Sequence, residues 1–257
     1  MPSLAIITGA LGNLGTELLR QCTKHYDRVI AIDRKEFRSG QDSLTSSGKV
    51  DWYFGSDGNL KEYGNFTSLV ENSLNPSQGM DRLVVFHAAA DVRFSSTLPA
   101  TDVFQNNVSL TLTVLEEAIV LSRKYSFASL KFVTFDSIGR VLVTSNSMNY
   151  SASKAAQNIY VRQLQTRDYS DVSILNLYLG FDDSSTNDHI RVNWLKMSTE
   201  SMVRNILSAA MGRRRQASIP RFRNAVVTCL SITISKFPPK FRRASETVLQ
   251  SIFRSSP

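Results

Sequence analysis

The stretch Leu4–Cys22, LAIITGALGNLGTELLRQC, decides the fold expected of this chain. Its apolar start, Leu4–Thr8, predicts a short buried strand, and the leucine spacing further on predicts a helix over Asn13–His25. Between them, Thr8–Gly15 (TGALGNLG) holds three glycines in eight residues. A strand, a glycine-rich turn and a helix N-terminus together form a common binding site for a dinucleotide pyrophosphate.

Each glycine of this turn has a physical role in such a site. Gly9 permits the tight turn, Gly12 lets the backbone approach phosphate without a Cβ in the way, and Gly15 lets the helix pack closely on the strand. The same string also occurs as an incidental loop, so the motif needs support from elsewhere. The cofactor-binding turn predicted here comprises Gly9, Leu11, Gly12, Asn13, Leu14 and Gly15.

The rest of the chain repeats the alternation of apolar runs and helical patterns. Further strands are predicted at Arg28–Asp33, Val50–Phe54, Arg82–Ala90, Leu130–Ser137 and Val172–Gly180. Helices are predicted at Val103–Lys124, Tyr150–Arg167 and around Trp194–Met211. This alternation implies parallel βαβ units, and therefore an α/β, Rossmann-like, doubly wound and mostly parallel sheet with helices on both faces.

An acidic residue at the end of the second predicted strand supports the nucleotide hypothesis. Asp33 follows Gly9 at the distance where a carboxylate accepts hydrogen bonds from the adenosine ribose hydroxyls. A carboxylate repels a 2′-phosphate, so Asp33 favours NAD. Arg34, Lys35 and Arg38 come directly afterwards and could instead hold that phosphate, so NADP stays an alternative.

Composition and charge set the broad class. The chain has 257 residues, 42% of them hydrophobic, which suits a globular protein with a real core. Cys22 and Cys229 lie far apart without a CxxC pattern, which indicates reduced thiols and a cytoplasmic location. The start, MPSLAIITGA, lacks the basic region of a signal peptide, and the histidines show no metal-ligand spacing, so no metal is expected.

The basic residues are concentrated near the end of the chain. The net charge is +8, yet the residues from Arg204 onward carry eleven lysines and arginines against one acid. We therefore expect a catalytic nucleotide-binding domain over 1–212 and a basic, partly apolar, helical extension of the same domain over 213–257. That extension either folds over the core with a solvated basic face or contacts an anionic membrane surface peripherally. Nucleic acid is not expected as a partner, because no reader motif is present.

A second motif makes the chain resemble the short-chain dehydrogenase/reductase family over roughly residues 4–190. Tyr150 and Lys154 in YSASK match the YxxxK of this family. Ser137 and Asn107 match the positions of its catalytic serine and of the asparagine that completes its tetrad; Asn106 is a neighbour that could be confused with the latter. The resemblance implies an NAD(P)-dependent enzyme with Asn107, Ser137, Tyr150 and Lys154 as catalytic residues.

The chemistry of these side chains agrees with that role. A phenol has a pKa near 10, and Lys154, one helical turn away, is expected to lower the pKa of Tyr150. Tyr150 would exchange a proton with the substrate, and Ser137 would hydrogen-bond the substrate oxygen. Lys154 would also bind the nicotinamide ribose, and Asn107 would hold a water that links Lys154 to solvent. The bound nicotinamide would exchange the hydride.

Other matches to the family are looser. Asp57 matches an aspartate that supports the adenine pocket, and Ala88, in the HAAAD stretch, would line the adenosine. His87 is more consistent with a packed, hydrogen-bonded strand end than with catalysis. Gly180 supplies the turn after the sixth predicted strand, where the family has Pro-Gly, so the nicotinamide contact there is in doubt. The glycine turn and the HAA form resemble the extended, epimerase-like branch.

Three functions remain open on this basis. The first is an oxidoreductase that interconverts a ketone and a secondary alcohol of a small molecule; the tail suggests a lipid-like substrate. The second is a nucleotide-sugar epimerase or dehydratase, which the extended-type motifs favour and the short C-terminal part opposes. The third is a sensor that binds NAD(P) without turnover. Family habit implies a homodimer or homotetramer through the Tyr150–Arg167 helix.

Overall fold

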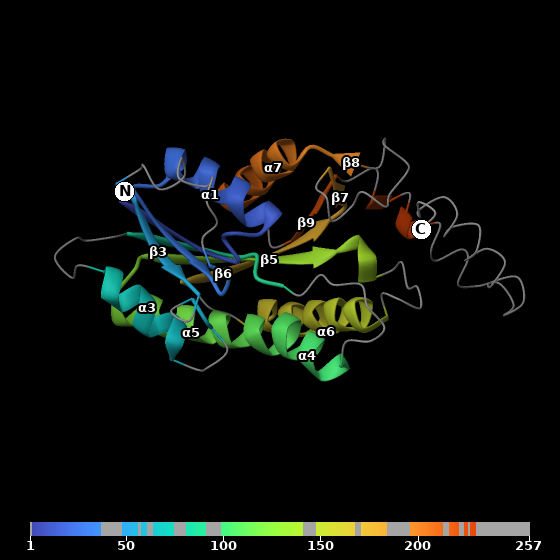
Figure 1. The fold of residues 1–257 in the computed structure, drawn as a ribbon, viewed down its shortest axis with the longest axis horizontal. Helices are drawn as coiled ribbons and strands as arrows, with labels where there is room; N and C mark the ends of the chain where they lie inside the picture. The colour runs from blue at the N-terminus through green and yellow to red at the C-terminus, as the bar shows by residue number, and fades with distance from the viewer. Residues whose placement is uncertain are drawn as a thin grey trace, which may run out of the picture.

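In the part of the chain that the structure describes, the fold is built on a seven-stranded parallel sheet that helices cover on both faces (Figure 1). This computed structural model describes residues 2–36, 48–55, 58–60, 64–74, 81–90, 99–140, 148–167, 171–183, 196–212, 216–220, 224–225 and 227–229. The strands of the main sheet are β1 (Ser3–Thr8), β2 (Arg28–Asp33), β3 (Val50–Phe54), β4 (Arg82–His87), β5 (Ser129–Ser137), β6 (Val172–Leu179) and β9 (Gln216–Ile219). Two short strands, β7 (Phe181–Asp182) and β8 (Lys196–Met197), pair separately.

The order of the strands confirms the predicted Rossmann-like fold. It is β3-β2-β1-β4-β5-β6-β9, and every neighbouring pair is parallel. The chain runs outward from β1 to β3 on one side, then returns to start β4 on the other side of β1. At this change of direction the carboxyl ends of β1 and β4 leave a crevice, which is the usual ligand site of such sheets.

The helices divide between the two faces of the sheet. In Figure 1, α1 (Asn13–His25) and α7 (Thr199–Met211) cover one face, and the other helices cover the opposite face. These others are α3 (Asn65–Ser73), α4 (Ala100–Phe104), α5 (Leu110–Lys124) and α6 (Met148–Gln165). None of the helices within the described ranges is long and apolar enough to cross a bilayer.

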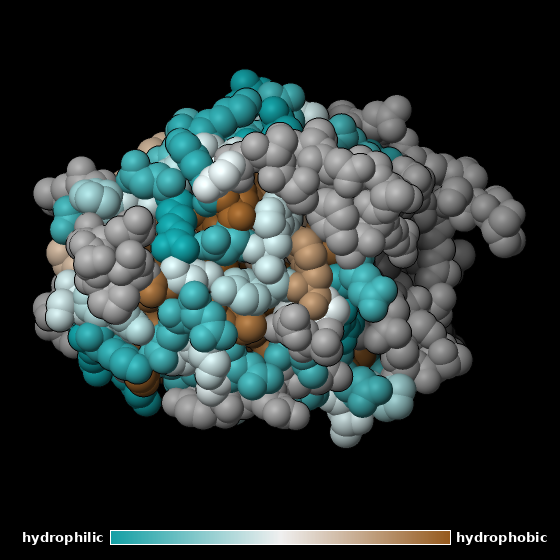
Figure 2. Space-filling view, turned by 60° about the vertical axis from the view of Figure 1, so that its left-hand side comes forward, coloured by the Kyte–Doolittle hydropathy of each residue, from teal (hydrophilic) through white to brown (hydrophobic). Residues whose placement is uncertain are grey.

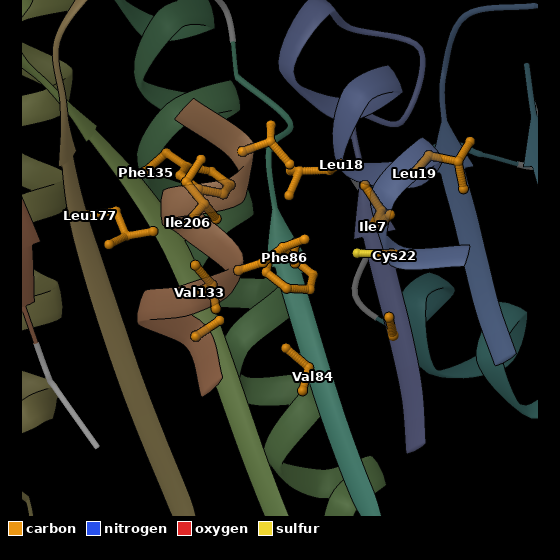
Figure 3. Packing of buried hydrophobic residues seen from close by; sticks show 14 of the residues in the cluster. Ile7, Leu18, Leu19, Cys22, Val84, Phe86, Val133, Phe135, Leu177 and Ile206 are labelled. Carbon is orange, nitrogen blue, oxygen red and sulfur yellow. The ribbon is translucent and has the colours of Figure 1, made fainter. Parts of the chain in front are cut away.

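Two apolar layers fill the space between sheet and helices. Figure 3 shows one of them, where Leu18 of α1 and Ile206 of α7 lie over Phe86 and Val133 of the sheet. The second layer joins α3, α5 and α6 to the opposite face and includes the buried Phe66 and Phe132. Burial of such side chains contributes about 1.5–3 kcal/mol each. Among the described residues on the face shown in Figure 2, most are hydrophilic and the hydrophobic ones form small separate areas.

The structure differs from the sequence-based prediction in two places that concern the site. The single helix predicted over Val103–Lys124 is α4 and α5 joined by a π-helical turn at Gln105–Ser109. The extension expected to be helical contributes β9, which pairs with β6 at the edge of the sheet. Most of the remainder of that extension lies outside the described residues.

Candidate active site

Five residues of the predicted site lie at the carboxyl ends of the strands. Gly9, Asp33, Ala88, Ser137 and Gly180 each stand at or directly after the carboxyl end of a strand. Because the strands are parallel, their carboxyl ends lie together at one end of the sheet. The fold therefore brings together segments that are far apart in the sequence.

The glycine turn has the close packing that a phosphate cradle requires. Gly9 adopts φ +71°, and a Cβ on it would lie 2.6 Å from the backbone nitrogen of Ala89. A Cβ on Gly15 would overlap the carbonyl oxygen of Gly9. Gly12 caps α1 without a side chain, and its N–H donates to the Gly9 oxygen at 3.0 Å. The N-terminus of α1 thus faces the turn with no bulky side chain in between.

Asp33 is fixed to this turn by hydrogen bonds. Its Oδ2 accepts from the Leu11 N–H at 2.8 Å, and its Oδ1 accepts from the Lys35 N–H at 2.9 Å. Each carboxylate oxygen can accept a further bond. The carboxylate is therefore held in one orientation and keeps acceptor capacity for ribose hydroxyls.

A pocket lies between the glycine turn and the end of β4. It collects five of the predicted residues, Gly9, Gly12, Asp33, Arg34 and Ala88. The other residues that line it are Ile32, Lys35, Gly58, Asn59, Leu60, Ala89, Ala90, Asn106 and Leu110. A carboxylate, two cations and a glycine cradle in one concave site fit the adenosine and phosphate part of a dinucleotide. Asp57, predicted to support the adenine, lies outside the described residues.

The two neighbouring asparagines of the π-helical turn have different surroundings. Asn106 lines the nucleotide pocket, whereas the Asn107 amide donates to the Ser153 hydroxyl of α6 at 3.0 Å. Ser153 donates in turn to the Tyr150 carbonyl at 2.8 Å. π-Helical turns within helices are frequent at functional sites. Here the turn connects the pocket lined by Asn106 with the start of α6.

Ser137 and Tyr150, both predicted as site residues, contact each other, but the environment of the phenol differs from the one expected. A hydrogen bond joins their side chains, and Tyr150 is buried. Burial raises the pKa of Tyr150 to about 12; the Ser137 bond lowers it and the Asp136 charge raises it. The expected lowering by Lys154 is therefore not what the structure has, because desolvation dominates. The phenol is protonated at neutral pH.

Lys154, one helical turn after Tyr150, is buried and its ammonium contacts the sheet. Its Nζ donates to the Phe135 carbonyl at 2.8 Å and to the Gln157 side-chain oxygen at 2.9 Å. Burial lowers its pKa to about 8, and the charge of Asp136 opposes that shift. Gln157 and its partner Thr134 were not predicted as site residues.

A buried ion pair next to Ser137 was also missed. Asp136 lies 2.9 Å from the Arg140 Nε, and its Oδ1 accepts from the Ser137 N–H at 2.8 Å. The Arg140 guanidinium stands over the Tyr178 ring at 4.8 Å. Burial raises the pKa of Asp136 to about 6 despite these partners. The pair anchors the segment that presents Ser137.

A C-terminal residue holds the turn at Gly180. The Asn224 amide donates to the Tyr178 carbonyl and the Ser218 hydroxyl at 3.0 Å each, and to the Ile219 carbonyl at 3.2 Å. A Cβ on Gly180 would overlap the Asn224 side-chain oxygen. Asn224 therefore gives this turn the rigidity that the missing proline would otherwise supply. No pattern near Asn224 signals this contact, which depends on the β6–β9 pairing.

His87 has the structural role that the sequence favoured. Its Nδ1 shares a 2.8 Å hydrogen bond with the Thr8 hydroxyl, and its ring stacks on Phe132. Burial, aided by the charge of Lys154, lowers its pKa to about 3. His87 is therefore neutral at physiological pH and no proton donor there.

We expect His87 to make the protein less stable in mild acid. An unfolded histidine takes up a proton below about pH 6.5, whereas the folded His87 does so only near 3, so stability falls as the pH drops through that window. By pH 5 the loss is about 2 kcal/mol. Urea unfolding of His87→Gln at pH 7.5 and 5 should show a smaller difference than wild type. His25→Gln, exposed at the end of α1, is the control; equal pH dependence of wild type and His87→Gln contradicts the assignment.

The fold is shared with many solved dehydrogenases. One is a short chain dehydrogenase from Burkholderia cenocepacia in complex with NADP, at 16% identity and TM-score 0.68, covering 96% of this chain and 97% of the other. Another is a variant actinorhodin polyketide ketoreductase with NADPH, at 16% identity and TM-score 0.68, covering 85% of this chain and 95% of the other. Serine dehydrogenase from Escherichia coli matches at 12% identity and TM-score 0.64, covering 84% of this chain and 96% of the other. At these identities the likeness concerns the fold alone.

Comparison of the sequence with family models identifies the family, which the structural likeness alone does not. A search of curated protein sequences finds no significant match. The sequence model of the NAD dependent epimerase/dehydratase family, by contrast, matches residues 5–188, which include the glycine turn, Asp33 and the YSASK motif. That span exceeds half of the chain and confirms the resemblance to the extended short-chain dehydrogenases/reductases. The chain therefore belongs to the NAD dependent epimerase/dehydratase family, a family of NAD(P)-dependent proteins.

Proposed function

We propose that this protein is an NAD(P)-dependent oxidoreductase that interconverts a ketone and a secondary alcohol. One observation carries the proposal: Ser137 and Tyr150 are joined by a side-chain hydrogen bond at the same carboxyl end of the sheet as the nucleotide pocket, and Lys154, one helical turn after Tyr150, is bonded to the Phe135 carbonyl of the strand that ends at Ser137. A protein that only sensed the nucleotide would have no need of a proton donor at this place.

Each side chain has a task that follows from its surroundings. NAD(P) bound in this pocket supplies hydride chemistry at its nicotinamide. Ser137, held through Asp136, hydrogen-bonds the substrate oxygen. Tyr150 gives its proton to that oxygen in carbonyl reduction and takes one back in alcohol oxidation. Lys154 provides a positive charge one helical turn after Tyr150, and Asn107 completes the set by fixing the start of α6 through Ser153.

The protonated state of Tyr150 favours one direction at neutral pH. Reduction needs the phenol, which is present below a pKa of about 12, whereas oxidation needs the phenolate. We therefore propose that carbonyl reduction is the faster direction near pH 7 and that alcohol oxidation gains as the pH rises.

The proposal is tested in two steps with the purified protein. Thermal unfolding is measured with NAD, NADH, NADP and NADPH, and then a panel of ketones and alcohols is screened through the nicotinamide absorbance. We expect stabilisation by the nucleotides and turnover of at least one ketone–alcohol pair. Stabilisation without turnover across a broad panel would contradict the oxidoreductase proposal and favour a sensor.

Asp33 is proposed to make NAD the preferred cofactor. Asp33→Asn keeps the shape but removes a charged acceptor, and such hydrogen bonds contribute about 1.5–3 kcal/mol. We expect NAD affinity to fall about tenfold or more, while NADP affinity changes less. Calorimetric Kd values for both nucleotides measure this, with Asp102→Asn on the exposed side of α4 as control. An unchanged ratio of the two Kd values would refute the role of Asp33.

A nucleotide-sugar epimerase or dehydratase is the second candidate. The family whose model matches residues 5–188 is named for these reactions, and this match is the observation that favours it. Such enzymes oxidise and then reduce within one cycle, so free NADH does not accumulate. Adding nucleotide sugars to the panel, with product analysis instead of absorbance, separates the two candidates.

A further inference from the structure

The face of α6 that lies on the sheet is unusually polar. Helix residues that pack against a sheet are normally apolar. In α6, however, Lys154, Gln157 and Asn158 are all buried there. Asn158 accepts a hydrogen bond from Asn176 of β6 at 2.9 Å, whereas the other two side chains bond to each other. A buried polar contact of this kind persists only where its partners are satisfied.

The contacts of Gln157 form a short chain from the sheet to Lys154. Its side-chain nitrogen donates to the Thr134 hydroxyl of β5 at 2.6 Å, and its oxygen accepts from the Lys154 Nζ at 2.9 Å. Thr134 is fully buried and Gln157 is 4% exposed. The ammonium can only donate, so it requires the amide oxygen to face it, and the amide nitrogen is then left to donate to Thr134.

We propose that Gln157 is the positioning residue for Lys154. Its amide oxygen orients the ammonium, and its amide nitrogen is held in turn by the hydrogen bond to Thr134 of β5. This inference rests on the proposed function of Lys154. An ammonium has three donors, and two of them go to Phe135 and Gln157, so these contacts set the direction of the third. The amide oxygen satisfies a donor without neutralising the charge, which a carboxylate at this place would do. The full charge therefore stays available to the site.

The charged and titratable groups around Lys154 come from three elements. His87 of β4 is neutral, Asp136 of β5 is paired with Arg140, and Tyr150 lies one turn earlier on α6. Asp136 acts on Lys154 through its charge and not through a hydrogen bond that holds the side chain. Among the described residues, Gln157 is thus the side chain that contacts the ammonium directly.

The test follows the titration of Lys154 itself and needs no substrate. The protein is labelled with ¹³C at the lysine Cε, and the Lys154 signal is identified by its loss in Lys154→Arg. The wild-type midpoint is expected at about 8. Gln157→Glu puts a carboxylate on the ammonium and should raise the midpoint by about 1–3 pH units. Gln157→Met removes an acceptor of the charged form and should lower it.

Two further variants make the result specific. Asn158→Asp introduces the same chemical change on the same helix, but next to Asn176, and should move the Lys154 midpoint less than Gln157→Glu. Thr134→Val leaves Gln157 in place and removes its anchor, so it should lower the midpoint as Gln157→Met does. An unchanged Lys154 midpoint in Gln157→Glu overturns the proposal. If Gln157→Glu does not fold, an unchanged midpoint in Thr134→Val overturns it instead. Failure of the proposed function would instead appear as a wild-type protein that turns over no ketone–alcohol pair, whatever the midpoint of Lys154.

Discussion

Tyr150→Phe is expected to reduce turnover by ~10²–10⁴-fold, the range found for removal of a general acid–base group. Phenylalanine keeps the buried ring and its packing, so the fold and the affinity for nicotinamide nucleotides should be preserved. What disappears is the proton donor and its hydrogen bond with Ser137. The loss should therefore fall on kcat and not on the nucleotide Kd.

The measurement compares kcat, KM and nucleotide affinity of wild type, Tyr150→Phe and Tyr160→Phe on the ketone–alcohol pair found in the screen. Tyr160 is on the same helix but 49% exposed, so the same substitution there should have no effect on kcat. In wild type the oxidation rate should rise with pH, and this rise should vanish in Tyr150→Phe. A fully active Tyr150→Phe would rule out proton transfer by this phenol.

The elements next to the glycine turn could be predicted from the sequence with little error. The bounds predicted for α1, β2 and β3 agree with the structure. The two strands are short runs bounded by a polar residue or a turn, and α1 starts where the glycines end. Local pattern therefore contains the needed information. The same holds for the meeting of Ser137 with Tyr150, because parallel strands and a connecting helix leave few other arrangements.

The parts that could not be predicted depend on contacts between distant segments. β9 is only four residues long and follows a run of arginines, so no periodicity marks it as a strand. Its pairing with β6 is what allows Asn224 to reach the turn at Gly180. The π-helical turn adds a residue to a helix without changing its apolar spacing enough to be recognised.

The polarity of the site explains the remaining omissions. Gln157 is a residue type that usually lies on a helix surface, and only the position of Thr134 shows that it faces the sheet. The same reason hides Asp136, which would be expected in solvent at the end of a strand. Its burial raises its own pKa, and its charge raises the pKa of Tyr150; sequence spacing gives no measure of burial.

Gly15→Ala separates the effect of local helix propensity from the effect of the nucleotide turn. Gly15 lies in the first turn of α1, where alanine in place of glycine should stabilise an ordinary helix by about 0.5–1 kcal/mol. In this fold, however, the added Cβ would overlap the Gly9 carbonyl oxygen and approach the Ala10 Cα to 2.9 Å. Both contacts are with backbone, and Gly9 itself packs closely against the backbone of Ala88 and Ala89, which leaves little room for it to shift.

We therefore expect Gly15→Ala to be destabilised by about 1–3 kcal/mol or more, the cost of overpacking, and to lose most of the thermal stabilisation by NAD. Urea unfolding and thermal shifts with NAD measure the two effects. Gly48→Ala is the matched control, because a Cβ there would meet no atom within 4 Å. If Gly15→Ala instead unfolds at higher urea and responds to NAD like wild type, the turn is not the tight phosphate cradle that its packing indicates. Because α1 can then dock on β1 with a larger residue at the contact, the pocket between Gly9 and Asp33 would also lose its geometric basis.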